Sequence, residues 1–165
     1  MNVVILGAGE VGFHIASRLA TEGNNVSVVD QDEERLQVIA DSMDVKTICG
    51  MASHPRILEA AEAGNADLLI AVTTNDEVNM LACQVAHSLF QVPTKLARVR
   101  ESDYALHRDE IIGRDDLPID VIISPEGEAA KVVMGRLNVS SALDAREFFG
   151  GAIQLVEFVV RPKSL

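Results

Sequence analysis

Residues 7–12 read Gly7-Ala8-Gly9-Glu10-Val11-Gly12, and this short loop decides the fold. It follows an apolar run at residues 3–6 that predicts a buried strand, and it opens an amphipathic run at residues 11–21 that predicts a helix. The backbone N–H groups of such a loop approach a pyrophosphate at a helix end that carries partial positive charge. Gly7 permits the tight turn, Gly9 lets a phosphate approach the backbone, and Gly12 lets the helix pack on the strand.

A glycine-rich turn alone is a weak signal, but an acidic residue at the right distance strengthens it. A second apolar run, residues 26–29, ends in Asp30, which lies 18 residues after Gly12; the spacing in dinucleotide-binding folds is about 20. The Asp30 carboxylate can accept hydrogen bonds from both hydroxyls of an adenosine ribose, and it would repel a 2′-phosphate. No arginine follows Asp30 immediately, which favours NAD(H) over NADP(H). The alternative is a structural turn followed by an acidic helix cap.

Composition and charge exclude several classes of protein. The chain has 165 residues, of which 48% are hydrophobic, and its formal net charge is −11. A strongly acidic globular chain argues against general nucleic-acid binding and against direct adhesion to anionic lipid. Its apolar runs are far shorter than the ~20 residues that span a bilayer, and its start has no basic region. We therefore expect a cytoplasmic protein without membrane insertion, with Cys49 and Cys83 as buried thiols.

Strand and helix patterns alternate from residue 2 to residue 123. Further strands are expected at residues 45–49, 68–72, 95–99 and 121–123. The alternation predicts an α/β fold, a Rossmann-like doubly wound parallel sheet of six strands with helices on both faces and strand order 3-2-1-4-5-6. We expect residues 1–123 to form one nucleotide-binding domain.

Capping signals and apolar spacing refine two of the expected helices. Ser53 precedes Pro55 and is expected to cap a short helix. Thr74 and Glu77 have capping-box spacing at the start of a longer one. On the longer helix, one apolar stripe is formed by Val78, Leu81, Ala82, Val85 and Leu89.

The end of the chain follows a different pattern. Residues 124–140 predict a crossover helix that begins at Ser124-Pro125. Two β-prone runs, residues 142–149 and 152–160, are joined at Gly150-Gly151 and predict a hairpin. Because this hairpin belongs to no β-α-β unit, we expect residues 141–165 to link to a C-terminal subdomain that is truncated.

Polar and charged groups follow several of the expected strands, where ligands bind in an open parallel sheet. Met51 and Ala52 offer apolar contact and backbone groups to an adenine edge. Residues 73–75 offer hydroxyls, an amide and helix N-terminal N–H groups to a phosphate or ribose. Arg98 and Arg100 are two apart on one strand, so both side chains can point to one face and meet a phosphate or carboxylate.

Two alternatives apply at these strand ends. The arginines could instead form surface ion pairs with the acids that follow, Glu101 or Asp103. The whole sheet could be the cofactor domain of an NAD-dependent dehydrogenase, which would need a substrate domain and an acid or base beside the nicotinamide. The sequence offers no obvious base at the strand ends, and its histidines lack metal-ligand spacing. We therefore expect no catalytic residue and no metal site.

Five segments, taken in order, resemble the RCK/KTN family, the regulator of potassium conductance and potassium transport nucleotide-binding domains. They are residues 7–12, Asp30, Gly50-Met51-Ala52-Ser53-His54-Pro55, the stretch Val72-Thr73-Thr74-Asn75-Asp76-Glu77-Val78-Asn79-Met80, and Ala97-Arg98-Val99-Arg100. The resemblance covers nearly the whole chain, and its Asn-Asp-Glu-x-Asn-Met segment is far more specific than the glycine loop.

The resemblance implies a cytosolic regulatory switch rather than an enzyme. In that family NAD⁺, NADH, ATP or ADP binds, and a homodimer that assembles into a larger ring gates a membrane potassium transporter from the inner face of the cell membrane. Many members have an arginine where this chain has Glu10 and an acid where it has Met51. Some channel-type members bind calcium with acids where this chain has Arg98 and Arg100, so calcium gating is not expected here.

The family's ligand positions can be carried over to the matching residues. They give a candidate cofactor-binding set that comprises Gly7, Gly9, Glu10, Val11, Gly12, Asp30, Gln31, Met51, Ala52, Thr73, Thr74, Asn75 and Arg98.

Overall fold

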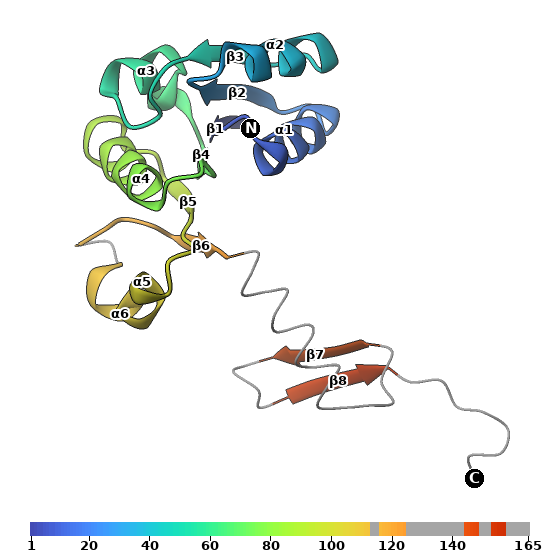
Figure 1. Ribbon diagram of the computed structural model, residues 1–165, viewed down its shortest axis with the longest axis vertical. Coiled ribbons are helices and arrows are strands. Elements are labelled where there is room, and N and C mark those ends of the chain that lie inside the picture. Colours follow the sequence, from blue (N-terminus) through green and yellow to red (C-terminus); the bar gives the residue numbers. More distant parts are fainter. Residues whose placement is uncertain (113–115, 125–143, 149–152, 158–165) are drawn as a thin grey trace, which may run out of the picture. The chain divides into compact units, whose positions relative to one another are not determined.

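The computed structural model describes residues 1–112, 116–124, 144–148 and 153–157, and the chain divides into two compact units, Met1–Ile123 and Ser124–Leu165. The first unit contains one parallel sheet (Figure 1). Its strands are β1 (Asn2–Leu6), β2 (Asn25–Asp30), β3 (Lys46–Cys49), β4 (Leu68–Ala71), β5 (Thr94–Arg98) and β6 (Val121–Ile123). They lie in the order β3-β2-β1-β4-β5-β6, which confirms the predicted order.

Helices cover both faces of this sheet. They are α1 (Glu10–Thr21), α2 (Glu33–Ser42), α3 (Pro55–Ala60), the 3₁₀ helix η1 (Ala63–Asn65), α4 (Asp76–Phe90), α5 (Ser102–Leu106) and α6 (Arg108–Ile111). Alternate side chains of a strand point to opposite faces. Thus Val3 and Ile5 of β1 pack in one core with residues of α1 and α2, whereas Val4 and Leu6 pack in a second core with residues of α3 and α4.

The register brings the carboxyl ends of the central strands to one edge. Leu6 of β1 pairs with Val29 of β2 and with Ala71 of β4. Just beyond this point, the Gly7 N–H donates to the Val29 carbonyl at 2.7 Å and the Val72 N–H donates to the Leu6 carbonyl at 2.8 Å. The segments that leave β1, β2 and β4 therefore start side by side, as the sequence predicts for a ligand-binding edge.

Two predicted helix caps are wrong by one residue each. The residue before α3 is His54, which makes no capping bond, whereas Ser53 is almost completely buried. The residue before α4 is Asn75, whose Oδ1 accepts from the Val78 N–H at 2.7 Å, so Asn75 and not Thr74 is the cap. Asparagine and threonine are both good caps, and the starting residue of the helix decides between them.

The apolar stripe predicted on α4 is wrong for two of its five residues. Leu81 and Leu89 are 52% and 61% exposed. Its other three residues, Val78, Ala82 and Val85, lie in or against the core as predicted, and the buried face of α4 also carries the polar Asn79. Cys49 is exposed as well, contrary to expectation, while Cys83 of α4 is buried.

The second unit contains two described strands, β7 (Asp144–Phe148) and β8 (Ile153–Glu157), which pair antiparallel. The turn expected between them and residues 125–140 of the expected crossover helix lie outside the described residues.

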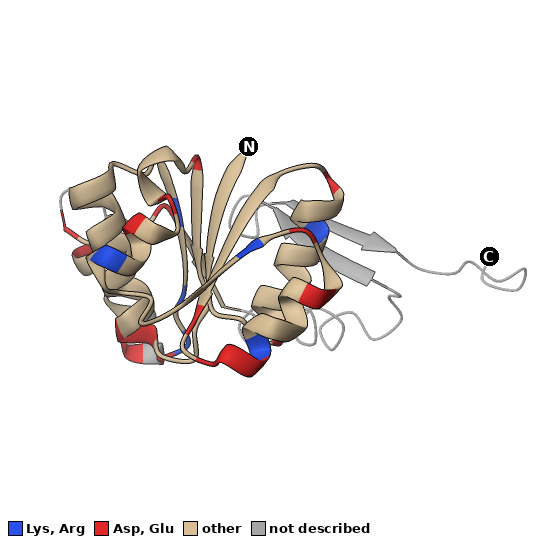
Figure 2. Ribbon diagram, turned by 90° about the horizontal axis from the view of Figure 1, so that it is seen from above, with Lys and Arg blue, Asp and Glu red and all other residues tan. Residues whose placement is uncertain are grey.

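No helix in the described part of the chain is long and apolar enough to cross a membrane. Acidic residues lie on the helices at both sides of the sheet (Figure 2).

Candidate functional site

A cavity of about 310 Å³ opens at the carboxyl edge of the sheet. It is lined by Gly7, Gly9, Glu10, Val11, Val29, Asp30, Gln31, Arg35, Gly50, Ala52, Val72, Thr73, Thr74, Asn75, Val78 and Arg98. The structure therefore brings together all of the candidate residues except Gly12 and Met51, which do not line the cavity. Arg35 was not among the predicted site residues, because nothing in its local sequence indicates that α2 would bring its side chain to the glycine loop.

The three glycines of residues 7–12 differ in what a side chain at each position would contact. Gly7 has a φ of +114°, a conformation that side chains rarely adopt, and an added Cβ would lie 2.9 Å from the Val72 carbonyl oxygen. A Cβ at Gly12 would lie 1.8 Å from the Gly7 carbonyl oxygen, so only glycine allows α1 to pack this closely. A Cβ at Gly9 would meet one atom, Nη1 of Arg35, at 4.0 Å. The absence of a side chain at Gly9 thus keeps the cavity open rather than the fold intact.

The start of α1 differs from the starts of the other two long helices. Gly9 is its N-cap and makes no side-chain capping bond. By contrast, Asp32 caps α2 by accepting from the Glu34 and Arg35 N–H groups, and Asn75 caps α4. The first-turn N–H groups of α1 are therefore left for water or an anion. Exposed Glu10 in the same turn opposes part of that attraction.

Asp30 is held in place from two sides. Its Oδ2 accepts from the Ala8 N–H at 2.6 Å, and its Oδ1 accepts from the Asp32 N–H at 3.0 Å. Each carboxylate oxygen can accept a second hydrogen bond. Asp30 therefore both fixes the glycine loop and keeps acceptor capacity for two ribose hydroxyls.

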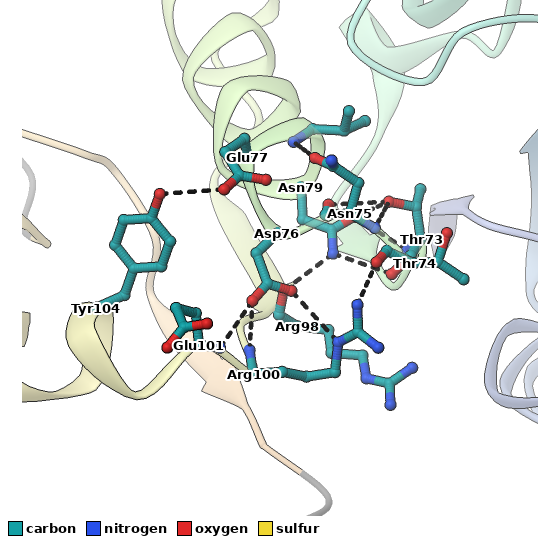
Figure 3. Close-up of polar contacts among 11 residues, drawn as sticks. Thr73, Thr74, Asn75, Asp76, Glu77, Asn79, Arg98, Arg100, Glu101 and Tyr104 are labelled. Carbon is teal, nitrogen blue, oxygen red and sulfur yellow. Dashed lines mark hydrogen bonds and ion pairs between the residues drawn. The ribbon is translucent and has the colours of Figure 1, made fainter.

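A buried asparagine organises the opposite wall of the cavity (Figure 3). Asn79 is fully buried; its Oδ1 accepts from the Thr73 N–H at 3.0 Å and from the Thr73 hydroxyl at 2.7 Å. Its Nδ2 donates to the Arg98 carbonyl at 2.9 Å, which ties the end of β4 to the end of β5. The Thr73 hydroxyl is therefore already engaged in hydrogen bonds. The hydroxyl of the exposed Thr74, by contrast, makes no hydrogen bond to a described residue.

The two arginines of residues 97–100 have separate surroundings. Arg98 lines the cavity, whereas Arg100 does not. The Arg100 guanidinium donates to the Thr74 carbonyl, and its Nε lies 3.6 Å from Oδ1 of Asp76. Asp76 is 7% exposed, and its Oδ2 accepts from the Arg100 and Glu101 N–H groups at 2.7 and 2.9 Å. The alternative interpretation, an ion pair of Arg100 with Glu101 or Asp103, is therefore wrong, since Asp76 is its partner (Figure 3).

Asp76 and Asn79 are the residues that sequence analysis missed as organisers of this site. Both are polar and both lie on the buried face of α4, three residues apart. A buried polar side chain must find hydrogen-bond partners, so this pattern was the available signal.

Reactive groups are scarce in the described part of the chain. No three His, Cys, Asp or Glu side chains are grouped there so that they could hold a metal ion. Burial raises the pKa of the Cys83 thiol to about 12, so this thiol stays protonated and unreactive. What the site offers is hydrogen-bond donors, acceptors and charge, which suit binding.

Comparison with known families gives a match over most of the chain. The family model described as the TrkA-N domain matches residues 3–125. Trk system potassium uptake protein TrkA of Azorhizobium caulinodans is 51% identical over 154 residues, which cover 93% of this chain and 34% of that protein. The chain thus spans about a third of the length of this curated relative.

Two solved structures share the fold. One is the TrkA-N domain of the inner membrane protein YbaL from Escherichia coli, with a TM-score of 0.70 and 19% identity over 82% of this chain and 95% of that one. The other is the GsuK channel bound to NAD, with a TM-score of 0.65 and 17% identity over 90% of this chain and 26% of that one. At these identities the likeness concerns the fold alone.

Proposed function

The chain belongs to the TrkA-N domain family, and from this premise we propose that residues 1–123 are the NAD(H)- or adenine-nucleotide-binding regulatory domain of a potassium-uptake transporter. The observation that carries the proposal is one cavity that joins the glycine loop, the uncapped start of α1 and the braced carboxylate of Asp30. The similar protein from Azorhizobium caulinodans is named as a potassium-uptake protein, and the similar GsuK structure is described as bound to NAD.

The ligand lies across the cavity in this proposal. Its pyrophosphate rests on Gly9 and the first N–H groups of α1, and its adenosine ribose donates to Asp30. The adenine lies beside Ala52, with Met51 contributing backbone at the rim. The distal end, a nicotinamide riboside or a terminal phosphate, reaches residues 73–75 and Arg98.

Gating follows from assembly in this proposal. Copies of the chain form a homodimer and then a larger ring on a membrane potassium transporter subunit, at the cytoplasmic side. Residues 124–165, where the sequence predicts a crossover helix, would connect this domain to the rest of the ring. A ligand shifts such an assembly only by the difference in its affinity for two arrangements.

The alternative is the cofactor domain of an NAD-dependent dehydrogenase. The name of the relative, a potassium-uptake protein, favours regulation over catalysis. Turnover separates the two: hydride exchange between bound NADH and common ketoacids above the background rate would favour the enzyme. The direct test of the proposal is calorimetry of the purified chain with NAD⁺, NADH, ATP and ADP. If none of the four binds, the proposal fails.

Asp30 is expected to select against a 2′-phosphate. We expect NADP(H) to bind at least about tenfold more weakly than NAD(H), a difference of roughly 1.4 kcal/mol, because two like charges would meet in a partly desolvated site. Calorimetry with NAD⁺, NADH, NADP⁺ and NADPH measures this ratio of affinities. In Asp30→Asn the affinities for NAD(H) and NADP(H) should become more similar, because the charge that repels the 2′-phosphate is gone. Any general weakening affects both cofactors and cancels in their ratio. Equal affinities for NAD(H) and NADP(H) in the unchanged chain would contradict the assignment.

Arg98 is expected to make the affinity depend on the group at the distal end of the ligand. NAD⁺ and NADH differ by one charge on the nicotinamide, and ATP and ADP differ by a terminal phosphate, whereas the glycine loop and Asp30 meet the part that all four share. Arg98→Ala should therefore change the relative affinities of these ligands more than the affinity for AMP, which lacks the distal end. Asp30→Ala is the matched comparison and should weaken all of them alike. Unchanged relative affinities in Arg98→Ala would move this role to residues 73–75.

A further inference from the structure

Arg35 is a cation that reaches the cavity from α2. Its backbone N–H donates to Oδ1 of Asp32 at 3.2 Å, and its Nε lies 3.1 Å from Oδ2 of the same carboxylate. One capping residue thus holds both the backbone and the guanidinium of Arg35. The side chain lines the cavity, and its Nη1 is the nearest atom to the open position at Gly9, 4.0 Å from where a Cβ would lie.

The charges around Gly9 make this position significant. Glu10 and Asp30 are the acids among the described residues that line the cavity, and both lie by the glycine loop. A pyrophosphate resting on Gly9 would add further negative charge to that end. Arg35 and Arg98 are the cations of the lining, and Arg98 comes from the strand-end wall opposite the loop. A planar guanidinium with outward N–H groups is the side chain best suited to a phosphate.

We propose that Arg35 is a specificity-determining residue whose guanidinium donates to the phosphate resting on Gly9, so that the site selects phosphorylated adenine nucleotides over adenosine. This inference rests on the proposed nucleotide site. Asp32 holds the guanidinium through Nε, and Nη1 remains as the atom nearest to the open position at Gly9. The preference arises from charge and geometry at one phosphate, so it is the same for NAD⁺ and ADP, which share that phosphate.

The test is calorimetry of the whole chain with ADP, NAD⁺ and adenosine, with adenosine also measured by competition. In Arg35→Gln, ADP and NAD⁺ should bind at least about tenfold more weakly while adenosine changes less than twofold, and the dependence of ADP affinity on salt should become shallower. Arg35→Lys should recover part of the loss, because it keeps the charge. Arg18→Gln is the matched control, since Arg18 is also an exposed helical arginine paired with an acid, Glu22, on its own helix.

Two results would overturn the inference. Unchanged ADP affinity in Arg35→Gln would show that the guanidinium does not meet the phosphate. An equal loss for adenosine and ADP would show that Arg35 meets the base or ribose, or only supports the loop. If neither ADP nor NAD⁺ bound the unchanged chain, the proposed function itself would fail and this inference with it.

Discussion

Gly9→Ala is expected to abolish binding of ADP and NAD⁺ while leaving the chain folded. Gly9 has φ −70° and ψ −176°, a backbone conformation open to any residue, and an added Cβ would meet only Arg35 Nη1 at 4.0 Å. The free energy of unfolding should fall by at most about 1 kcal/mol, because alanine is a poorer N-cap than glycine. The methyl group, however, would occupy the space in which the proposed phosphate approaches the backbone. Calorimetry and urea unfolding measure the two quantities separately.

Gly12→Ala is the partner experiment and should behave in the opposite way. Its Cβ would lie 1.8 Å from the Gly7 carbonyl oxygen and 2.9 Å from the Gly7 carbonyl carbon, so the backbone itself would have to move. We expect a loss of about 4 kcal/mol or more in the free energy of unfolding, at the upper end of single substitutions. Unchanged ADP affinity in Gly9→Ala would show that no phosphate rests on this loop. Full stability of Gly12→Ala would contradict the close packing of α1 on the loop.

The fold was predictable because its signals are local and repeated. Each strand is a short apolar run, each helix has its own amphipathic pattern, and their alternation leaves few possible topologies. Glycine spacing and Asp30 then indicate where the ligand edge lies, since both follow strands whose carboxyl ends meet.

The organisation of the cavity wall depends on contacts between distant segments, which no local pattern reports. Asn79 is buried because its partners are the backbone groups of Thr73 and Arg98, 6 and 19 residues away. Hydrophobicity alone therefore placed Leu81 and Leu89 on the apolar stripe of α4 and left Asn79 out, although both leucines are exposed. Arg35 was missed for a similar reason: its reach toward Gly9 depends on how α2 packs beside the loop.

Asn79→Leu is expected to cost about 3 kcal/mol in the free energy of unfolding. Leucine has the same branching and the same number of side-chain heavy atoms as asparagine, so the change removes hydrogen bonds without opening a cavity. It leaves the Thr73 N–H without its acceptor and removes the hydrogen bond that Asn79 donates to the Arg98 carbonyl, at a site where Asn79 is fully buried. Each unsatisfied buried group costs about 1–3 kcal/mol. Urea unfolding measures the loss, and Gln84→Leu on the same helix is the control, because Gln84 is only half-buried and bonds to Ser88 nearby.

The effect of Asn79→Leu on ligand affinity shows whether Asn79 positions the site or only stabilises the core. Asn79 bonds to the backbone of both Thr73 and Arg98. Its loss should therefore loosen residues 73–75 and Arg98, which meet the distal end of the proposed ligand. At a temperature where the variant is still folded, Asn79→Leu should therefore weaken NADH more than it weakens AMP, which ends before this wall. Asn79→Asp keeps an acceptor for Thr73 but loses the donor to Arg98, and it should show the same order of effects. An equal loss for both ligands would mean that Asn79 stabilises the fold without positioning the site, because a general loosening would not favour one end of the cavity over the other.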